Sequence, residues 1–157
     1  MRVLILGASG MLGHKCWQVC KTRFETWGTV RGNAGTSAHH HLFSSGRLLG
    51  GVDATDLRRV VQAVQETRPA VVINCIGIVK QLPEASDPVA CLTVNALFPH
   101  QLARLCAVAG ARLIHISTDC VFSGRRGAYQ EADSADAEDL YGRSKLLGEV
   151  CGEGRVT

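Results

Sequence analysis

Two side chains near the end of the sequence have the chemistry of a proton donor and its activator. Tyr141 and Lys145 stand four residues apart in the run Tyr-Gly-Arg-Ser-Lys, so a helix would carry both on one face. A phenol titrates near pH ~10 and is a poor acid at neutrality, but a fixed cation beside it favours the phenolate. Such a phenol can give a proton to a carbonyl oxygen. The same spacing also occurs in ordinary exposed helix pairs, so the motif needs support from elsewhere in the chain.

A glycine-rich turn near the start of the chain gives the second chemical signal. Gly7, Gly10 and Gly13 follow an apolar run at residues 2–6 and open a helical pattern. The first glycine allows a tight turn, the second lets the backbone approach a pyrophosphate, and the third lets the helix pack on the sheet. Amides at the helix start then point toward the anion. A glycine turn can also serve packing alone, but in this context we predict dinucleotide contacts at Gly7, Ser9, Gly10, Met11, Leu12 and Gly13.

Apolar strand patterns alternate with helical patterns along the chain. Branched apolar runs predict five strands, at residues 2–6, 26–31, a short run ending at 53, 70–76 and 111–116. Helical spacing predicts helices from 11 to 20, from 56 to about 67, from 88 to 109, and around Tyr141 and Lys145. The alternation predicts one α/β domain over residues 1–157, a Rossmann-like, doubly wound parallel sheet of order 3-2-1-4-5. We expect the ligand crevice beyond the carboxyl ends of strands 1 and 4.

Two segments depart from this regular alternation. Pro99 lies inside the helical pattern at 88–109, where we expect a bend rather than two separate helices. The polar stretch 32–51 predicts a surface loop with a short helix or an edge strand inside it. It contains His39, His40 and His41, and three consecutive histidines cannot all face one metal from regular structure. We therefore interpret them as solvated and predict no metal site.

The composition is that of one folded domain and argues against several classes of protein. The chain has 157 residues, 46% hydrophobic and 20% charged, with a formal net charge of +3. Its basic residues are scattered, so we predict no nucleic-acid partner. The seven cysteines form no Cys-x-x-Cys pair and mostly lie in apolar stretches, which indicates buried thiols in a reducing cytosol. No stretch reaches the roughly 20 apolar residues of a membrane span and no signal peptide is visible, so we expect a soluble, cytoplasmic protein.

The motifs together resemble the short-chain dehydrogenase/reductase superfamily. The first glycines are spaced Gly-x-x-Gly-x-x-Gly, residues 117–124 read Ser-Thr-Asp-Cys-Val-Phe-Ser-Gly, and the tyrosine motif is followed by Gly148 and Glu149. This set resembles the extended branch of nucleotide-sugar enzymes, and within it most nearly the dTDP-4-dehydrorhamnose reductase family. Cys120 stands where that family often has tyrosine, so the sugar itself stays open.

The resemblance implies an oxidoreductase of dTDP-rhamnose biosynthesis, which reduces a nucleotide-linked 4-keto-6-deoxy sugar with NAD(P)H. Tyr141 would be the general acid, Lys145 would hold the cofactor ribose and favour the phenolate, and Thr118 would hydrogen-bond the substrate carbonyl. Ser117 is the less favoured neighbour. The remaining implied cofactor contacts are Asp53 near the adenine, the backbone of Cys75, Ile76 and Gly77 along the ribose, and Asn95 as a support, with a solvated or capping amide as the alternative for Asn95.

The choice of cofactor depends on the end of the second strand. An acidic residue there would bind the ribose hydroxyls of NAD. This chain instead has Arg31, with no carboxylate beside it in the sequence, and an arginine can bind a 2′-phosphate. We therefore favour NADP(H) over NAD(H), with a plain surface arginine as the alternative.

Enzymes of the extended branch are longer than this chain. We expect a fragment or truncated product that is incomplete at its C-terminus, with Arg155 and Val156 opening a further strand and with the substrate region missing. Exposed sheet edges and apolar helix faces would then favour self-association into a homo-oligomer. Two alternative functions stay open. One is a non-catalytic NADP-binding module, by resemblance to the regulatory subunit of methionine adenosyltransferase, and the other is a nucleotide-sugar epimerase or dehydratase.

Overall fold

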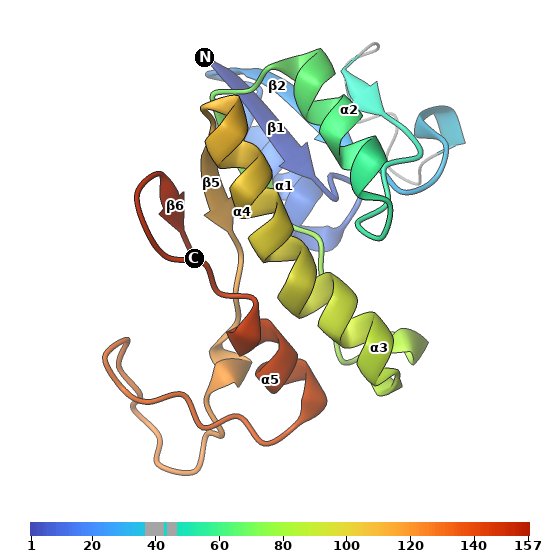
Figure 1. Ribbon diagram of the computed structural model, residues 1–157. Coiled ribbons are helices and arrows are strands. Elements are labelled where there is room, and N and C mark those ends of the chain that lie inside the picture. Colours follow the sequence, from blue (N-terminus) through green and yellow to red (C-terminus); the bar gives the residue numbers. More distant parts are fainter. Residues whose placement is uncertain (37–42, 44–46) are drawn as a thin grey trace.

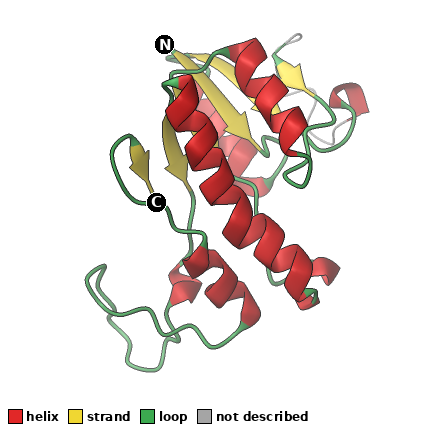
Figure 2. Cartoon of the chain, in the orientation of Figure 1, coloured by secondary structure: helices red, strands yellow, loops and turns green. Residues whose placement is uncertain are grey.

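One parallel β-sheet with helices on both faces forms the frame of the molecule (Figures 1 and 2). The computed structural model describes residues 1–36, 43 and 47–157. The six strands of this sheet lie in the order β3-β2-β1-β4-β5-β6, and every neighbouring pair is parallel. Their bounds are β1 Arg2–Leu6, β2 Glu25–Thr29, β3 Leu48–Leu49, β4 Val71–Asn74, β5 Arg112–His115 and β6 Arg155–Val156. The predicted order 3-2-1-4-5 is confirmed, and β6 adds the further strand expected at Arg155 and Val156.

The third strand lies earlier than predicted. It is the two-residue strand β3, inside the stretch 32–51, and not a run that ends at residue 53. The chain turns at Gly51, whose φ of +68° belongs to the left-handed region that glycine adopts without strain. The apolar pattern that predicted a strand up to residue 53 therefore covers both the strand β3 and the turn after it. The histidines at 39, 40 and 41 lie outside the described residues.

Helices cover the sheet at the predicted places. Their bounds are α1 Met11–Cys20, α2 Leu57–Thr67, α3 Pro88–Cys91, α4 Phe98–Ala109 and α5 Leu140–Leu147, with short 3-10 turns η1 Ala34–Thr36, η3 Pro83–Ser86 and η5 Asp119–Val121. Asp56 caps α2 by accepting a hydrogen bond from the Arg58 amide, and Asp87 caps α3 in the same way from Val89. Both helices therefore begin next to an aspartate, at the positions where the sequence predicts helices from 56 and from 88.

Pro99 is accommodated by a wide helical turn. A π-helical segment, η4 Leu92–Leu97, joins α3 to α4 without interruption, and the Phe98 amide donates to the Thr93 carbonyl five residues back. Proline has no amide hydrogen and its ring crowds the preceding turn, so a widened turn before it relieves both problems. The pattern at 88–109 thus forms one continuous rod, visible in Figure 1 as α3 leading into α4, rather than two separate helices.

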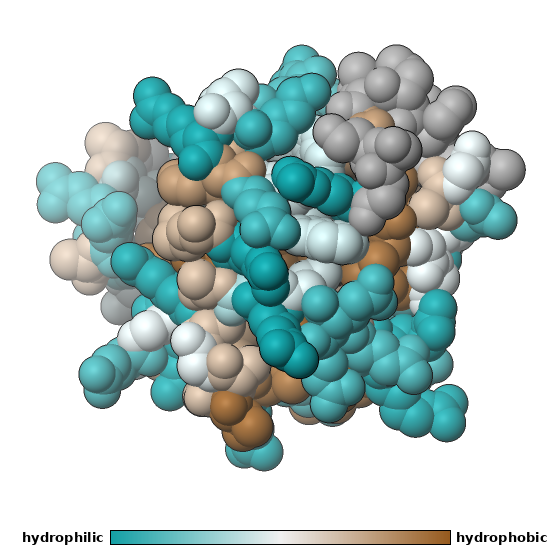
Figure 3. Space-filling view, turned by 90° about the horizontal axis from the view of Figure 1, so that it is seen from above, coloured by the Kyte–Doolittle hydropathy of each residue, from teal (hydrophilic) through white to brown (hydrophobic). Residues whose placement is uncertain are grey.

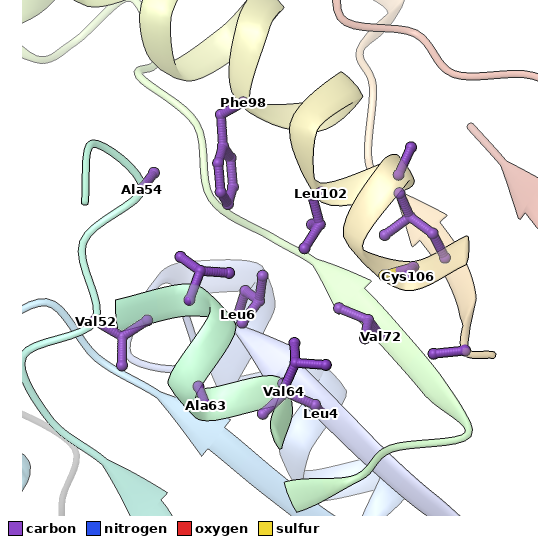
Figure 4. Packing of buried hydrophobic residues seen from close by; sticks show 14 of the residues in the cluster. Leu4, Leu6, Val52, Ala54, Ala63, Val64, Val72, Phe98, Leu102 and Cys106 are labelled. Atoms are coloured by element: carbon purple, nitrogen blue, oxygen red, sulfur yellow. The ribbon is translucent and has the colours of Figure 1, made fainter. Parts of the chain in front are cut away.

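Two apolar clusters hold the helices to the sheet. On one face, Leu4 and Leu6 of β1 point toward Val64 of α2 and toward Phe98 and Leu102 of α4 (Figure 4). On the other face, Val3 and Ile5 pack with Trp17 of α1. Successive residues of a strand point to opposite faces, so β1 must be apolar throughout to serve both clusters.

The face of the molecule seen from above is mostly polar (Figure 3). Figure 3 shows charged and polar side chains over much of the face seen from above, with smaller apolar patches between them. No helix in the described part of the chain is long and apolar enough to cross a membrane. The described His, Cys, Asp and Glu side chains form no group of three or more that could hold a metal ion.

The cysteines are free, but the prediction that they are buried is only partly right. Cys91 and Cys106 are buried, Cys151 is exposed, and the other four, Cys16, Cys20, Cys75 and Cys120, are half-buried. Burial raises the pKa of the Cys106 thiol to about 11. Burial is also the largest cause that raises the pKa of Cys75 to about 12, with Cys16 and Cys20 adding to it. These two thiols are therefore neutral at physiological pH.

Candidate functional site

The glycine turn has the backbone that a close approach to phosphate requires. Gly7 has a φ of +76°, and a side chain there would also meet Ile76 at 3.0 Å. A Cβ on Gly13 would stand 2.1 Å from the Gly7 carbonyl oxygen, so α1 packs against the turn at a distance that only glycine permits. Gly10 donates its amide to the same carbonyl at 3.0 Å. The turn is therefore tight and placed at the carboxyl end of β1.

The amino end of α1 suits an anion. Gly10 is its N-cap and supplies no side-chain hydrogen bond, and the first turn contains no acidic residue. Amides at such an end carry a partial positive charge that a phosphate can complement. Met11 is 87% exposed and Leu12 is 43% exposed, so the outer side of this turn is open to solvent. These residues fit the pyrophosphate of a dinucleotide.

Helix α5 carries Tyr141 and Lys145 to the far side of the same edge of the sheet, beyond the carboxyl end of β5 (Figure 1). Lys145 is only 4% exposed, and its Nζ donates a hydrogen bond to the Ile116 carbonyl oxygen at 2.6 Å. Burial lowers the pKa of Lys145, while the charge of Glu149 opposes that shift. Its Nζ also lies 4.0 Å from the point where a Cβ on Gly77 would stand. Lys145 thus lies between the segments that follow β4 and β5.

Asn95 is a buried bridge and not a solvated amide. Its Oδ1 accepts from the Ile78 amide at 2.8 Å, and its Nδ2 donates to the Ile78 carbonyl at 3.0 Å and to Ser144 Oγ at 3.2 Å. It is 1% exposed. Asn95 therefore joins the loop after β4 to Ser144 of α5, the residue that precedes Lys145.

Thr118 and Ser117 face different partners. Ser117 Oγ donates to Glu149 Oε1 at 2.7 Å, which engages its hydroxyl within the fold. Thr118 Oγ1 accepts from the Cys120 amide at 3.2 Å and caps η5. A Cβ on Gly142 would stand 2.2 Å from the Cys120 carbonyl oxygen, so the first turn of α5 lies directly against this loop. The close packing brings the Thr118 segment next to the turn that carries Tyr141.

Asp53 and Arg31 are neighbours in space, a relationship that the sequence did not show. Asp53 Oδ1 accepts from the amide and the hydroxyl of Thr55 at 2.8 and 2.6 Å. Burial by itself raises the pKa of this carboxyl, but the bonds from Thr55 and the charge of Arg31 outweigh it, so the pKa is lowered. Arg31 has no carboxylate beside it in the sequence, and it is near enough to Asp53 for its charge to contribute the smallest part of this shift. The β2 strand ends at Thr29, which leaves Arg31 in the turn that follows it.

Sequence reasoning missed a buried pair at the ends of β4 and β5. Asn74 Nδ2 lies 3.0 Å from His115 Nδ1, and Asn74 Oδ1 accepts from the Ile76 amide at 3.1 Å. Burial lowers the pKa of His115 to about 4, with smaller contributions from the charges of Lys145 and His100. The neutral ring thus holds Asn74, which in turn holds the backbone of residues 75–77. The sequence did contain a signal for this pair, because the apolar strands β4 and β5 each end in a polar residue, Asn74 and His115.

A cavity of about 630 Å³ opens beside the start of α5. Its lining includes Lys80, Asp119, Cys120, Phe122, Tyr129 and Asp139. Lys80, which no motif singled out, pairs with Asp139 at 2.6 Å. The wall combines charged side chains such as Lys80 and Asp139 with the apolar surface of Phe122, a combination that a hydroxylated ring can match.

The doubly wound sheet, the glycine turn and the tyrosine and lysine on one helix define an α/β protein of the short-chain dehydrogenase/reductase type. More narrowly, the chain belongs to the RmlD substrate binding domain family, which matches residues 1–153. The resemblance inferred from the motifs is thereby confirmed.

Three relatives illustrate the match. The dTDP-4-dehydrorhamnose reductase of Streptomyces griseus is 37% identical over 149 residues, which cover 94% of this chain and 43% of that protein. Methionine adenosyltransferase 2 subunit beta of Mus musculus is 32% identical over 148 residues, covering 94% of this chain and 41% of that protein. The crystal structure of a dTDP-4-dehydrorhamnose reductase from Bacillus anthracis in complex with NADP is 28% identical, with a TM-score of 0.73 over 94% of this chain and 47% of its own. The chain thus spans about half the length of these relatives.

Proposed function

We propose that the protein reduces the 4-keto group of a nucleotide-linked 6-deoxy sugar with a nicotinamide cofactor. The observation that carries this proposal is the buried Lys145, fixed to the Ile116 carbonyl, on the same helical turn as Tyr141 and facing the sheet edge that holds the glycine turn. The relatives named dTDP-4-dehydrorhamnose reductase support the sugar and the reaction. The 630 Å³ cavity, with charged and apolar side chains in its wall, supports a hydroxylated ring.

The chain's own residues account for the proton and for the orientation of the carbonyl. A reduced nicotinamide, when bound, supplies the hydride. Tyr141 donates a proton to the carbonyl oxygen as negative charge grows there, and the Lys145 ammonium stabilises the phenolate that remains. Thr118 Oγ1 donates a second hydrogen bond to that oxygen. Ser117 donates to Glu149 at 2.7 Å and Thr118 donates to Asp119 at the longer distance of 3.3 Å, so the Thr118 hydroxyl is the more easily redirected to a substrate.

The cofactor contacts follow the sheet edge. We infer that Gly7, Gly10, Gly13 and the amides at the start of α1 bind the pyrophosphate. Asp53 lies toward the adenine, and the backbone of residues 75–77 follows the ribose, with Asn95 and the Asn74–His115 pair holding that backbone in place. Arg31 would bind a 2′-phosphate, and the NADP complex of the Bacillus anthracis relative supports a dinucleotide cofactor. The nearby Asp53 reduces the preference, because its charge opposes a second anion.

The test is NADPH oxidation with a nucleotide-linked 4-keto-6-deoxy sugar such as dTDP-4-dehydrorhamnose, followed by absorbance. Tyr141→Phe removes only the hydroxyl, so it should lower turnover by about 100-fold or more while leaving NADPH binding within about twofold. Lys21→Met, at the end of α1 and outside the cavity, is the control and should keep full turnover. Full activity in Tyr141→Phe would refute the assignment of the proton donor.

Two other functions are separated by the same assay. The similarity to methionine adenosyltransferase 2 subunit beta supports a non-catalytic cofactor-binding module. That function predicts NADPH binding with no turnover of any keto-sugar, and activation of a partner that Tyr141→Phe leaves intact. An epimerase or dehydratase would convert its sugar without net consumption of NADPH.

A further inference from the structure

Lys80 occupies a junction between three segments of the site. It lies in the loop between β4 and η3, and its Nζ is 2.6 Å from Asp139 Oδ2. The same Nζ lies over the ring of Tyr141, 5.6 Å from the ring centroid. Lys80, Cys120 and Asp139 line one cavity, although they come from the loop after β4, the loop after β5 and the start of α5. A single ammonium therefore contacts both Asp139 and the Tyr141 ring and shares the cavity wall with Cys120.

Asp139 connects this ammonium to the helix that carries Tyr141. Its Oδ1 accepts a hydrogen bond from the Gly142 amide at 2.7 Å and caps α5, while its Oδ2 pairs with Lys80. The bond from Gly142 and then the bond from Lys80 lower the pKa of Asp139. The bond to Asp139 raises the pKa of Lys80. Both groups are therefore charged at neutral pH, so the contact is an ion pair.

We propose that the Lys80–Asp139 ion pair positions the Tyr141 ring at the edge of the cavity. A cation over the face of a tyrosine is attracted by the ring and restricts its orientation. Asp139 fixes that cation relative to the first turn of α5, and so relative to the backbone of Tyr141 itself. Lys80 is a positioning residue in this scheme, because it acts through Tyr141.

This inference deepens the proposed function, in which Tyr141 is the proton donor. A donor must be held within hydrogen-bond reach of the carbonyl, and a small displacement reduces the rate steeply. Lys80 lies outside the glycine turn that would hold the pyrophosphate. Loss of Lys80 should therefore reduce turnover and leave the affinity for the cofactor unchanged.

The position of the ring can be measured without cofactor or substrate. The chain has only two tyrosines, Tyr129 and Tyr141, so a sample labelled with ¹³C at tyrosine gives two sets of ring signals, assigned with Tyr129→Phe. Lys80→Met removes the charge at similar length, and it should shift and broaden the Tyr141 signals. Lys80→Arg should restore them. Lys21→Met, at the far end of α1, removes one charge elsewhere and should leave them in place.

A second variant separates the ion pair from the helix cap. Asp139→Asn keeps an oxygen that can cap α5 and removes the charge that holds Lys80. It should shift the Tyr141 signals as Lys80→Met does, and the double variant should shift them no further than either single change. In the keto-sugar assay each variant should lower turnover by about tenfold, with the KM for NADPH within about twofold of the wild type.

The two proposals fail in different ways. Tyr141 signals that are identical in the wild type, Lys80→Met and Asp139→Asn would overturn the positioning role, whatever the activity. A wild-type protein that binds NADPH and reduces no keto-sugar would instead count against the proposed reaction, and the ring signals would still decide the role of Lys80.

Discussion

The Nζ of Lys145 donates a hydrogen bond of 2.6 Å to the carbonyl oxygen of Ile116, which ties helix α5 to the segment that leaves β5. The side chain is buried and its ammonium has lost most of its water, which lowers the pKa of Lys145. An ammonium held by one carbonyl still has two hydrogens to donate. The contact therefore both fixes the lysine and leaves it able to bind a further polar group.

Lys145→Met should test the role of this lysine in binding the cofactor. The variant removes the donor for a cofactor ribose and should weaken NADPH binding by about tenfold or more, measured by fluorescence titration. Lys21→Met removes the same charge at the end of α1 and is the control, so it should leave NADPH affinity unchanged. Unchanged NADPH affinity in Lys145→Met would remove this lysine from the cofactor site.

His115 should make the protein sensitive to acid. Its pKa falls from 6.5 to about 4 on folding, so the unfolded chain binds a proton in this range and the folded protein does not. Stability contributed by the neutral ring is present above pH 6.5 and is lost as the pH falls toward about 4. Between pH 6.5 and a pH below about 4, this change in the pKa of His115 lowers the free energy of unfolding by about 3 kcal/mol.

Urea unfolding at pH 7.0 and pH 4.5 checks this expectation. His115→Gln cannot titrate, so it should lose less stability between the two pH values than the wild type does. His14→Gln, at a half-buried position of α1, is the control and should lose as much stability as the wild type does. Equal acid sensitivity in His115→Gln and the wild type would contradict the assignment.

Gly142→Ala should disrupt the contact between α5 and the Thr118 loop. The added methyl would stand 2.2 Å from the Cys120 carbonyl oxygen and 2.8 Å from the Ala137 side chain, so one segment must move. We expect a loss of about 3 kcal/mol in the free energy of unfolding and loss of keto-sugar turnover. Gly32→Ala is the matched control, because a methyl there meets nothing within 4 Å. A wild-type melting curve for Gly142→Ala would show that the helix and loop separate easily.

Asn95→Ala should destabilise the fold around the site. It removes the hydrogen bonds to the Ile78 amide, the Ile78 carbonyl and Ser144, and leaves these groups buried without a partner. Such losses cost about 2–4 kcal/mol in the free energy of unfolding. Denaturant unfolding measures this, with the exposed Asn33→Ala as control. A loss below about 0.5 kcal/mol would mean that water replaces the amide.

Arg31→Ala tests the choice of cofactor. Loss of the guanidinium should weaken NADPH binding by about tenfold and leave NADH binding nearly unchanged, because only NADPH carries the 2′-phosphate. Calorimetric titration with both cofactors gives the ratio of affinities. If both affinities change equally, Arg31 is a surface arginine without a role in the discrimination.

The strand order and the place of the chemical motifs could be predicted from the sequence because their signals are local. A buried parallel strand is apolar throughout, as β1 is, and a glycine at a tight turn or a helix stop stands at the position that needs it. The position of β3 was mispredicted because its signal is only two residues long and the turn at Gly51 depends on its neighbours. Short strands at a sheet edge have too few residues to show a pattern.

The sequence by itself therefore determined the class of fold, the glycine turn and the tyrosine and lysine on one helical turn, since each depends on spacings of a few residues. Only the tertiary structure decided which distant residues meet. Asn74 pairs with His115 across 41 positions, Asn95 reaches Ser144 across 49, and Lys80 meets Asp139 from a different loop. These contacts follow from the register of β4 against β5 and from the packing of α5 on η4, and so from the whole sheet rather than from any local pattern.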